Sequence, residues 1–141
     1  MSEYQKDKYT ISTDKSRLDT AAMHDYLSNH SYWAKGRSME QVLLTIEHSL
    51  CFGLYHDRQQ VGFARVITDY ATFAYLADVY ILEKDRGHGL SKWMMECIMS
   101  NPQLQNLRRF MLATRDAHTL YEKFGFKPLS KPERWMEIFK E

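Results

Sequence analysis

A short loop with two glycines carries the clearest chemical signal in this sequence. The loop Arg86-Gly87-His88-Gly89-Leu90-Ser91 follows strand-forming residues and precedes a segment with helical apolar spacing. Glycine lets successive backbone N–H groups turn toward one point, and the first N–H groups of a helix lack partners within it. The helix dipole adds positive charge, and Arg86 can donate two hydrogen bonds to an oxyanion. The loop predicts an anion site, with a plain strand-to-helix turn as the alternative.

A second group of chemically capable side chains lies between Ser31 and Arg37. This segment contains Tyr32 and Trp33 beside two basic residues. The rings can stack on a cationic or planar ligand, and Arg37 can pair with a carboxylate. The alternative is that both rings fill the core and Arg37 is a solvated charge.

The spacing of apolar residues predicts the elements that hold these two segments. The expected order is strand, two helices, three strands, helix, strand, short helix and two strands. The three consecutive strands are typical of an antiparallel meander. We therefore expect an α+β fold with a mixed, mostly antiparallel central sheet and flanking helices. The expected ranges are residues 9–12, 14–29, 39–49, 49–55, 60–68, 72–82, 90–100, 108–114, 116–124, 126–127 and 134–139.

Residue types at the ends of these ranges predict helix caps. Asp14 or Ser16 is the candidate N-cap of the first helix, and Ser38 is the candidate for the second. Gly125 is expected to end the short helix in a left-handed conformation.

Length and composition limit the class of protein. A chain of 141 residues, 44% hydrophobic and 26% charged, fits one compact domain over residues 1–141 with a flexible start over residues 1–8. Its 19 basic and 18 acidic side chains give a net charge of +1, which argues against a nucleic-acid partner. Cys51 and Cys97 lack metal-site spacing, so no metal is expected. No segment has the length of a membrane span, so we expect a cytoplasmic protein with no membrane partner.

Two blocks of the sequence resemble signatures of the GNAT superfamily of acetyltransferases. Arg86-x-x-Gly89-x-Ser91 resembles the acyl-coenzyme-A signature Gln/Arg-x-x-Gly-x-Gly/Ala, with Ser91 in place of Gly or Ala. Residues 117–126 resemble the segment Asn-x-x-Ala-x-x-x-Tyr-x-x-x-Gly-Phe, with Thr114 in place of Asn. One helix and one strand separate the blocks, as in that family. The expected order of elements also matches the family fold over nearly the whole chain.

The resemblance implies how acetyl-CoA binds as a cosubstrate. A bulge splays the third meander strand from the strand at 108–114, and the pantetheine arm pairs with the exposed backbone. The backbone of Val79, Tyr80 and Ile81 is expected to make these bonds, with a further contact at Thr114. The pyrophosphate is expected on the amides of Arg86, Gly87, His88, Gly89, Leu90 and Ser91.

The resemblance also implies direct transfer of the acetyl group to an amine. Tyr121 matches the family's general acid, which contacts the cofactor and protonates the departing thiolate. Asp78, just before the bulge, is the expected general base, with a pKa raised by its apolar neighbours. His118 is the alternative base, because it lies three residues before Tyr121 on nearly one helix face. Solvent can also accept this proton.

The expected acceptor is the primary amine of a small metabolite. In the family it lies across the sheet from the cofactor, near the loop between the first two helices. A protein lysine or N-terminus is the alternative acceptor, and a non-catalytic acyl-CoA sensor is the alternative function. A homodimer is expected only by analogy with relatives that pair through their C-terminal strands. The side chains expected to line the acceptor pocket are Tyr32, Trp33, Arg37, Phe73 and Tyr75, with Trp135 as a further wall.

Overall fold

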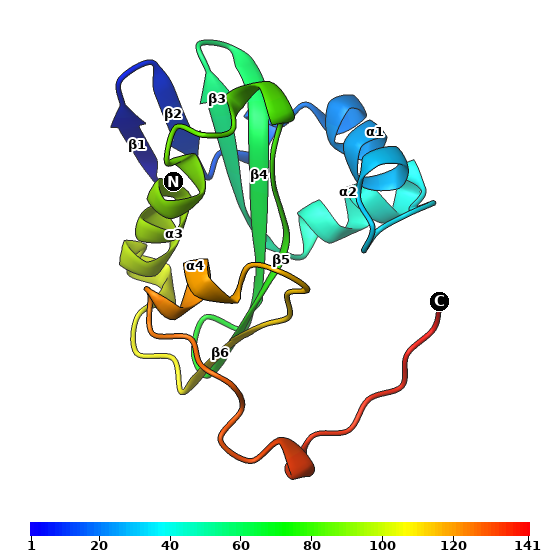
Figure 1. Ribbon diagram of the computed structural model, residues 1–141. Helices are drawn as coiled ribbons and strands as arrows, with labels where there is room; N and C mark the ends of the chain where they lie inside the picture. The colour runs from blue at the N-terminus through cyan, green and yellow to red at the C-terminus, as the bar shows by residue number, and fades with distance from the viewer.

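The computed structural model describes residues 1–141 and contains one six-stranded sheet with helices on both sides (Figure 1). The strands lie in chain order, and all neighbours are antiparallel except β5 and β6. This confirms the predicted mixed, mostly antiparallel α+β fold. The strands are β1 (Glu3–Lys6), β2 (Tyr9–Ser12), β3 (Leu50–His56), β4 (Gln59–Thr68), β5 (Phe73–Ile81) and β6 (Arg109–Leu112). The helices are α1 (Thr20–His30), α2 (Met39–Glu47), α3 (Leu90–Ser100) and α4 (His118–Glu122), with 3-10 turns at Lys15–Arg17, Glu83–Asp85, Pro102–Leu104 and Pro132–Arg134.

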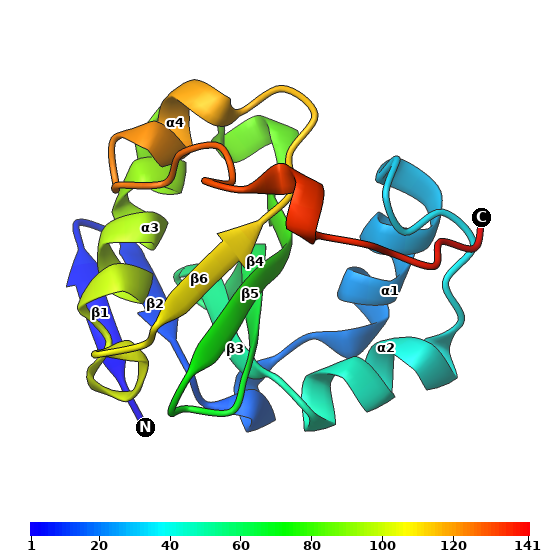
Figure 2. The same cartoon turned by 90° about the horizontal axis from the view of Figure 1, so that it is seen from below.

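The sheet is the middle layer between two apolar cores. On one face α3 packs its side chains, Met94 among them, against strand residues such as Leu76. On the other face α1 and α2 bury residues such as Met23 against Phe63. Figure 2 shows α3 and α4 on one side of the sheet and α1 and α2 on the other. None of the helices has the length and hydropathy needed to cross a membrane.

A bulge in β5 changes which way its side chains point. The register between β4 and β5 shifts between Phe63 and Arg65, so two residues of β5 oppose one of β4. Asp78 has a φ of 54°, in the left-handed region that residues other than glycine seldom adopt. After it, Tyr80 belongs to the core under α1 and α2, whereas Val79 packs against the core under α3. The bulge therefore aims Asp78 toward the loop between α1 and α2.

Strands β5 and β6 pair over only part of β5. Their parallel register runs from Phe73 and Arg109 to Leu76 and Leu112, and then stops. Residues 77–81 therefore have β4 as their only strand partner. This confirms the predicted splay of the sheet at the bulge and leaves one backbone edge of β5 unpaired.

Side-chain caps fix where the first two helices begin. Ser38 accepts a bond from the amide of Gln41, and the Gln41 side chain accepts one from the amide of Ser38, which confirms this predicted cap. The first helix starts later than predicted. Asp14 caps only the turn Lys15–Arg17. Asp19 caps α1, because its side chain accepts a hydrogen bond from the amide of Ala22 at 3.1 Å. An extended residue separates the two helical segments, which apolar spacing alone does not reveal.

Both chain ends differ from the predicted elements. The expected flexible start contains β1, which pairs with β2 and is held by a 3.2 Å bond from Asn101 Nδ2 to the Tyr4 hydroxyl. The predictions of strands at 126–127 and 134–139 are wrong, because no neighbouring strand pairs with either segment. Pro132–Arg134 forms a 3-10 turn instead. Strand-forming residue types favour a strand, but a strand also needs a backbone partner.

Candidate active site

The glycine loop lies between the end of β5 and the start of α3. Gly87 and Gly89 have φ values of 86° and 72°, left-handed angles that favour glycine. Gly89 is the N-cap of α3, and no side chain caps the first amides of this helix. A Cβ atom added at either glycine would meet nothing within 4 Å. The loop therefore presents backbone donors to open space, as an anion site requires.

A cavity of about 270 Å³ opens onto these donors. It is lined by every residue of the predicted loop except His88. The His88 side chain is exposed, and its ring lies 6.5 Å from the ring of Tyr9. The lining residues are Ile81, Arg86, Gly87, Gly89, Leu90, Ser91, Lys92 and Leu120.

The Arg86 side chain is engaged within the protein. Its Nε donates to the Ile81 carbonyl at 3.0 Å, and its Nη2 donates to the Tyr26 hydroxyl at 3.3 Å. These bonds tie the loop to β5 and α1. The Arg86 amide is engaged as well, because it donates to the Glu83 carbonyl at 3.2 Å. The backbone amides of Gly87–Ser91, rather than Arg86 with its predicted bidentate guanidinium, are therefore the donors free to meet an anion.

The three residues predicted to pair with an extended ligand lie on the unpaired edge of β5. Tyr80 is buried and stacks on Tyr26, with ring centroids 4.0 Å apart and an interplanar angle of 13°. Val79 and Ile81 pack in the core under α3. Because both cores hold these side chains, the backbone between them is fixed. The Ile81 carbonyl already accepts a bond from Arg86, but no strand lies along this edge of β5, so an added strand can pair with it.

Tyr121 lies at a larger cavity, of about 700 Å³, between β6, α4 and the C-terminal segment. Phe126 packs edge-on against its buried ring. Burial raises the pKa of Tyr121, and the nearby Tyr32 and Asp116 raise this pKa further. Helix α4 borders both cavities, because Leu120 lines the smaller one and Tyr121 the larger one.

Three more predicted residues share the larger cavity with Tyr121: Tyr75, Thr114 and His118. The Thr114 hydroxyl accepts a bond from the amide of Ala117 at 3.0 Å and so fixes the start of α4. The His118 side chain is exposed. The structure therefore brings the predicted acid and the alternative base to one cavity.

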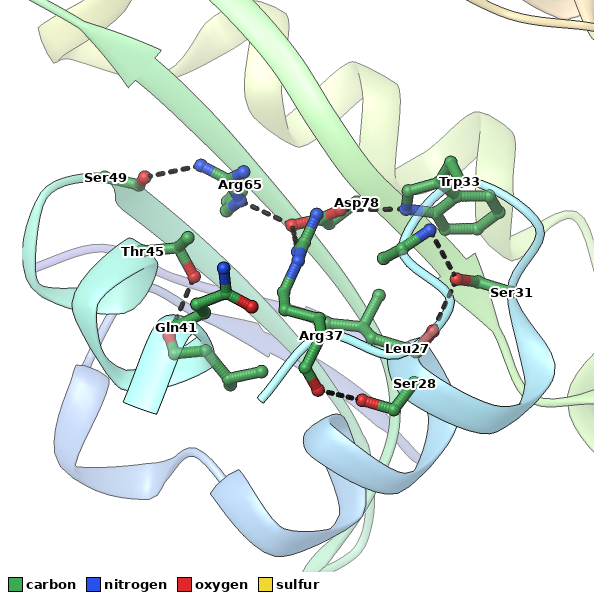
Figure 3. A network of polar contacts seen from close by, with 12 residues as sticks. Leu27, Ser28, Ser31, Trp33, Arg37, Gln41, Thr45, Ser49, Arg65 and Asp78 are labelled. Carbon is green, nitrogen blue, oxygen red and sulfur yellow. Dashed lines mark hydrogen bonds and ion pairs between the residues drawn. The ribbon is translucent and has the colours of Figure 1, made fainter. Parts of the chain in front are cut away.

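Asp78 is buried and lies at the centre of a polar cluster (Figure 3). Its Oδ1 accepts a bond from Trp33 Nε1 at 2.8 Å. Its Oδ2 accepts bonds from Arg37 Nη1 at 2.6 Å and from Arg65 Nε at 2.5 Å. Arg65 also donates through Nη1 to the Ser49 hydroxyl at 3.1 Å. We call Trp33, Arg37, Arg65 and Asp78 the Asp78 cluster.

The prediction of a raised pKa for Asp78 is wrong. Burial does push its pKa upward, but the charge and hydrogen bonds of Arg65, together with those of Arg37, outweigh burial and hold the pKa below its ordinary value. A carboxylate held in its charged form by two guanidinium groups is a weak proton acceptor. The geometry therefore gives no support to Asp78 as the general base.

The other predicted acceptor residues lie at different places. The Tyr32 ring packs under Arg115, whose Cζ atom is 3.9 Å from the ring centroid, so the loop between α1 and α2 meets the loop before α4. Phe73 stands at the partly exposed start of β5 and lines neither cavity. Trp135 lines the larger cavity and packs against Arg109.

Sequence reasoning missed Arg65 and Ser49. Arg65 is a single charged residue within an apolar strand, Val61 to Ile67, and it is buried. A buried charge needs a buried partner, so this position already indicated an ion pair inside the fold. Nothing in the sequence marks Ser49 as the second hydrogen-bond partner of Arg65.

The segment from just before β3 to just beyond α4, residues 47–128, matches a family model described as an acetyltransferase (GNAT) domain. The chain belongs to the GNAT acetyltransferase family. The matched residues include the meander, the glycine loop and the helix that carries Tyr121. The resemblance seen in the sequence is therefore confirmed. Members of this family bind acetyl-CoA.

Several relatives are similar to this GNAT protein over most of its length. A crystal structure of a provisionally named GNAT-family acetyltransferase from Xanthomonas campestris matches 94% of this chain and 93% of its own, with 51% identity and a TM-score of 0.92. A provisionally named acetyltransferase of Gibberella zeae is 36% identical over an alignment of 137 positions, which covers 82% of this chain and 76% of the fungal one. A predicted acetyltransferase from Clostridium acetobutylicum, solved with acetyl-CoA, shares the fold over 93% of this chain and 94% of its own, with 13% identity and a TM-score of 0.64.

Proposed function

We propose that this GNAT protein transfers an acetyl group from acetyl-CoA to the primary amine of a small metabolite. The main support is the continuity of the site. The unpaired edge of β5 leads from the bulge to the glycine loop, and α4 borders both cavities through Leu120 and Tyr121. The cavity of about 700 Å³ that Tyr121 lines has the size of a small-molecule site beside the proposed acid.

The residues present fit acetyl-CoA. The amides of Gly87–Ser91, at the N-terminus of α3, can hold the pyrophosphate. The backbone of Val79–Ile81 can pair with the pantetheine arm as an added strand. Bound acetyl-CoA supplies an activated acetyl group, and holding it beside the amine provides much of the rate through proximity.

Transfer requires one bond made, one bond broken and two proton movements. The amine nitrogen bonds to the carbonyl carbon, the carbon–sulfur bond breaks, and Tyr121 donates its hydroxyl proton to the departing thiolate. A backbone N–H of β5 is the candidate donor to the carbonyl oxygen as that atom gains negative charge. The amine loses its proton to solvent or to His118, which lines the same cavity as Tyr121.

The raised pKa of Tyr121 predicts how turnover depends on pH. A tyrosine hydroxyl ordinarily loses its proton near pH 10, and burial moves this loss to higher pH. The proton-donating form is therefore present at all lower pH values, and kcat should stay level from about pH 8.5 to 10. The measurement is kcat against pH with both substrates saturating. A fall in kcat with a midpoint near pH 8 would contradict the acid role of Tyr121.

Steady-state release of the CoA thiol with a panel of primary amines tests the proposed function. We expect turnover with at least one small amine. Turnover confined to peptides, at a lysine or an N-terminus, would support a protein acetyltransferase instead. Tight acetyl-CoA binding without turnover on any amine or peptide would support a non-catalytic sensor.

We also propose that two copies of the chain pair through their C-terminal segments. This segment leaves the body of the molecule as a lone extended stretch (Figure 1), and its Met136 and Ile138 are 96% and 94% exposed. The outer edge of β6 has no strand partner. In a two-fold pair, the exposed apolar segment of each copy can cover the open sheet edge of the other copy.

Light scattering during size exclusion checks this pairing. We expect the wild-type protein to have twice the mass of one chain. Ile138→Glu places a charge in the C-terminal segment, so this variant should have the mass of one chain. A wild-type protein that stays monomeric at high concentration would contradict the pairing.

A further inference from the structure

The Asp78 cluster carries one positive charge in excess. Two guanidinium groups face a single carboxylate, whose side chain is only 2% exposed. Arg65 is 11% exposed and bonds to Ser49 as well, whereas Arg37 is 19% exposed and reaches Asp78 through one nitrogen. The uncompensated charge therefore meets solvent at Arg37. The remaining N–H groups of its guanidinium can bind an anion.

The backbone that carries Arg37 is held in place by its own loop (Figure 3). The Ser28 hydroxyl donates to the Arg37 carbonyl, and the Arg37 amide donates to the Ala34 carbonyl at 3.0 Å. The Ser31 hydroxyl donates to the Leu27 carbonyl at 2.6 Å. A site that is fixed before its ligand arrives loses less conformational entropy on binding.

The Asp78 cluster lies beside the proposed reaction centre. Asp78 lies in the bulge, two residues beyond Leu76, where the pairing between β5 and β6 ends. Trp33, which bonds to Asp78, follows Tyr32, and their rings make a T-shaped contact at 5.1 Å. The Tyr32 ring packs in turn under Arg115, in the loop that leads to α4. Tyr32 and Trp33 therefore connect the bulge to the helix that carries the proposed acid.

We propose that Asp78 is a positioning residue that fixes Arg37 and Trp33 as one wall of the acceptor site, and that this wall selects amines that also carry a carboxylate. The proposal rests on the proposed function, because it assigns the acceptor class of the same site. The carboxylate of Asp78 balances Arg65 and orients Arg37. The planar guanidinium of Arg37 then meets the carboxylate of the acceptor while its amine lies toward the thioester.

Pairs of acceptors that differ only in a carboxylate test this proposal. Each pair is an amino acid and the amine left when its carboxyl group is removed, such as lysine and cadaverine. For wild type we expect kcat/KM to favour the amino acid of the best pair by about tenfold or more. Asp78→Asn should raise the KM for the amino acid by about tenfold and bring the preference close to one, with the KM for acetyl-CoA unchanged.

Asp57→Asn is the matched control for this substitution. Asp57 has a φ of 55°, nearly the same left-handed backbone as Asp78, but it lies in the exposed turn between β3 and β4. This variant should keep the wild-type preference and both KM values. A purely structural role of Asp78 would lower the folded fraction and leave the preference between the two acceptors unchanged.

Arg37→Gln gives a second test in case Asp78→Asn fails to fold. It removes the recognising charge from a partly exposed position and leaves the Asp78–Arg65 pair intact, so the same loss of preference is expected. Two results would overturn this inference and leave the proposed function standing. One is a wild-type protein that turns over the amino acid and its decarboxylated amine equally well. The other is a folded variant that keeps the wild-type preference for the amino acid. Absence of turnover with every amine would reject the proposed function and this inference with it.

Discussion

Gly89→Asp is expected to abolish acetyl-CoA binding, with Kd raised about 100-fold or more. The new carboxylate would stand at the N-cap of α3, where no side chain now caps the first amides. It would accept hydrogen bonds from the backbone amides proposed to bind the pyrophosphate, and it would place a negative charge beside the two phosphates. Titration calorimetry with acetyl-CoA measures the loss.

The fold should survive this substitution. Aspartate tolerates the left-handed angle of Gly89, φ 72°, better than most residues, and its Cβ would meet nothing within 4 Å. Gly89→Asn is the matched control, because it adds the same shape without the charge and should weaken binding less. A folded Gly89→Asp protein with wild-type Kd would rule out the loop as the pyrophosphate site.

Tyr121→Phe is expected to lower kcat about 100-fold, the usual contribution of a positioned general acid. The ring packs against Phe126 in the wild-type protein, and phenylalanine preserves that contact. The Kd for acetyl-CoA should therefore change little. Steady-state kinetics gives kcat, and calorimetry gives the Kd on the same preparation.

Tyr55→Phe is the control for loss of a buried tyrosine hydroxyl. The Tyr55 hydroxyl is buried without a hydrogen-bond partner, and Tyr55 lines neither cavity. This variant should keep the wild-type kcat. If Tyr121→Phe were as active as Tyr55→Phe, water or another side chain would be the proton donor.

Local features of the sequence were sufficient to predict the glycine loop and the helix that follows it. The helix predicted at 90–100 is α3 with the same bounds, because the glycines before it and Pro102 after it mark its ends. The left-handed Gly89 and the similarly left-handed Gly125, at φ 95°, also follow from residue type and position. These features depend on a few neighbouring residues, so a single sequence contains them.

Features that depend on distant partners were not predictable in the same way. Asp78 stands between two apolar residues, which predicted a raised pKa. The two arginines that lower this pKa come from positions 13 and 41 residues away in the chain. The segment 134–139 has the composition of a strand, but no strand lies beside it. In both cases the outcome depends on which other segment is in contact, and residue types alone do not specify that.

A crystal structure with bound acetyl-CoA tests the central claim most directly. We predict the pyrophosphate on the backbone amides of Gly87–Ser91 and the pantetheine arm along Val79–Ile81. We also predict the thioester sulfur within hydrogen-bonding reach of the Tyr121 hydroxyl. A pyrophosphate bound away from the glycine loop, or a sulfur atom out of reach of Tyr121, would contradict the proposed donor site.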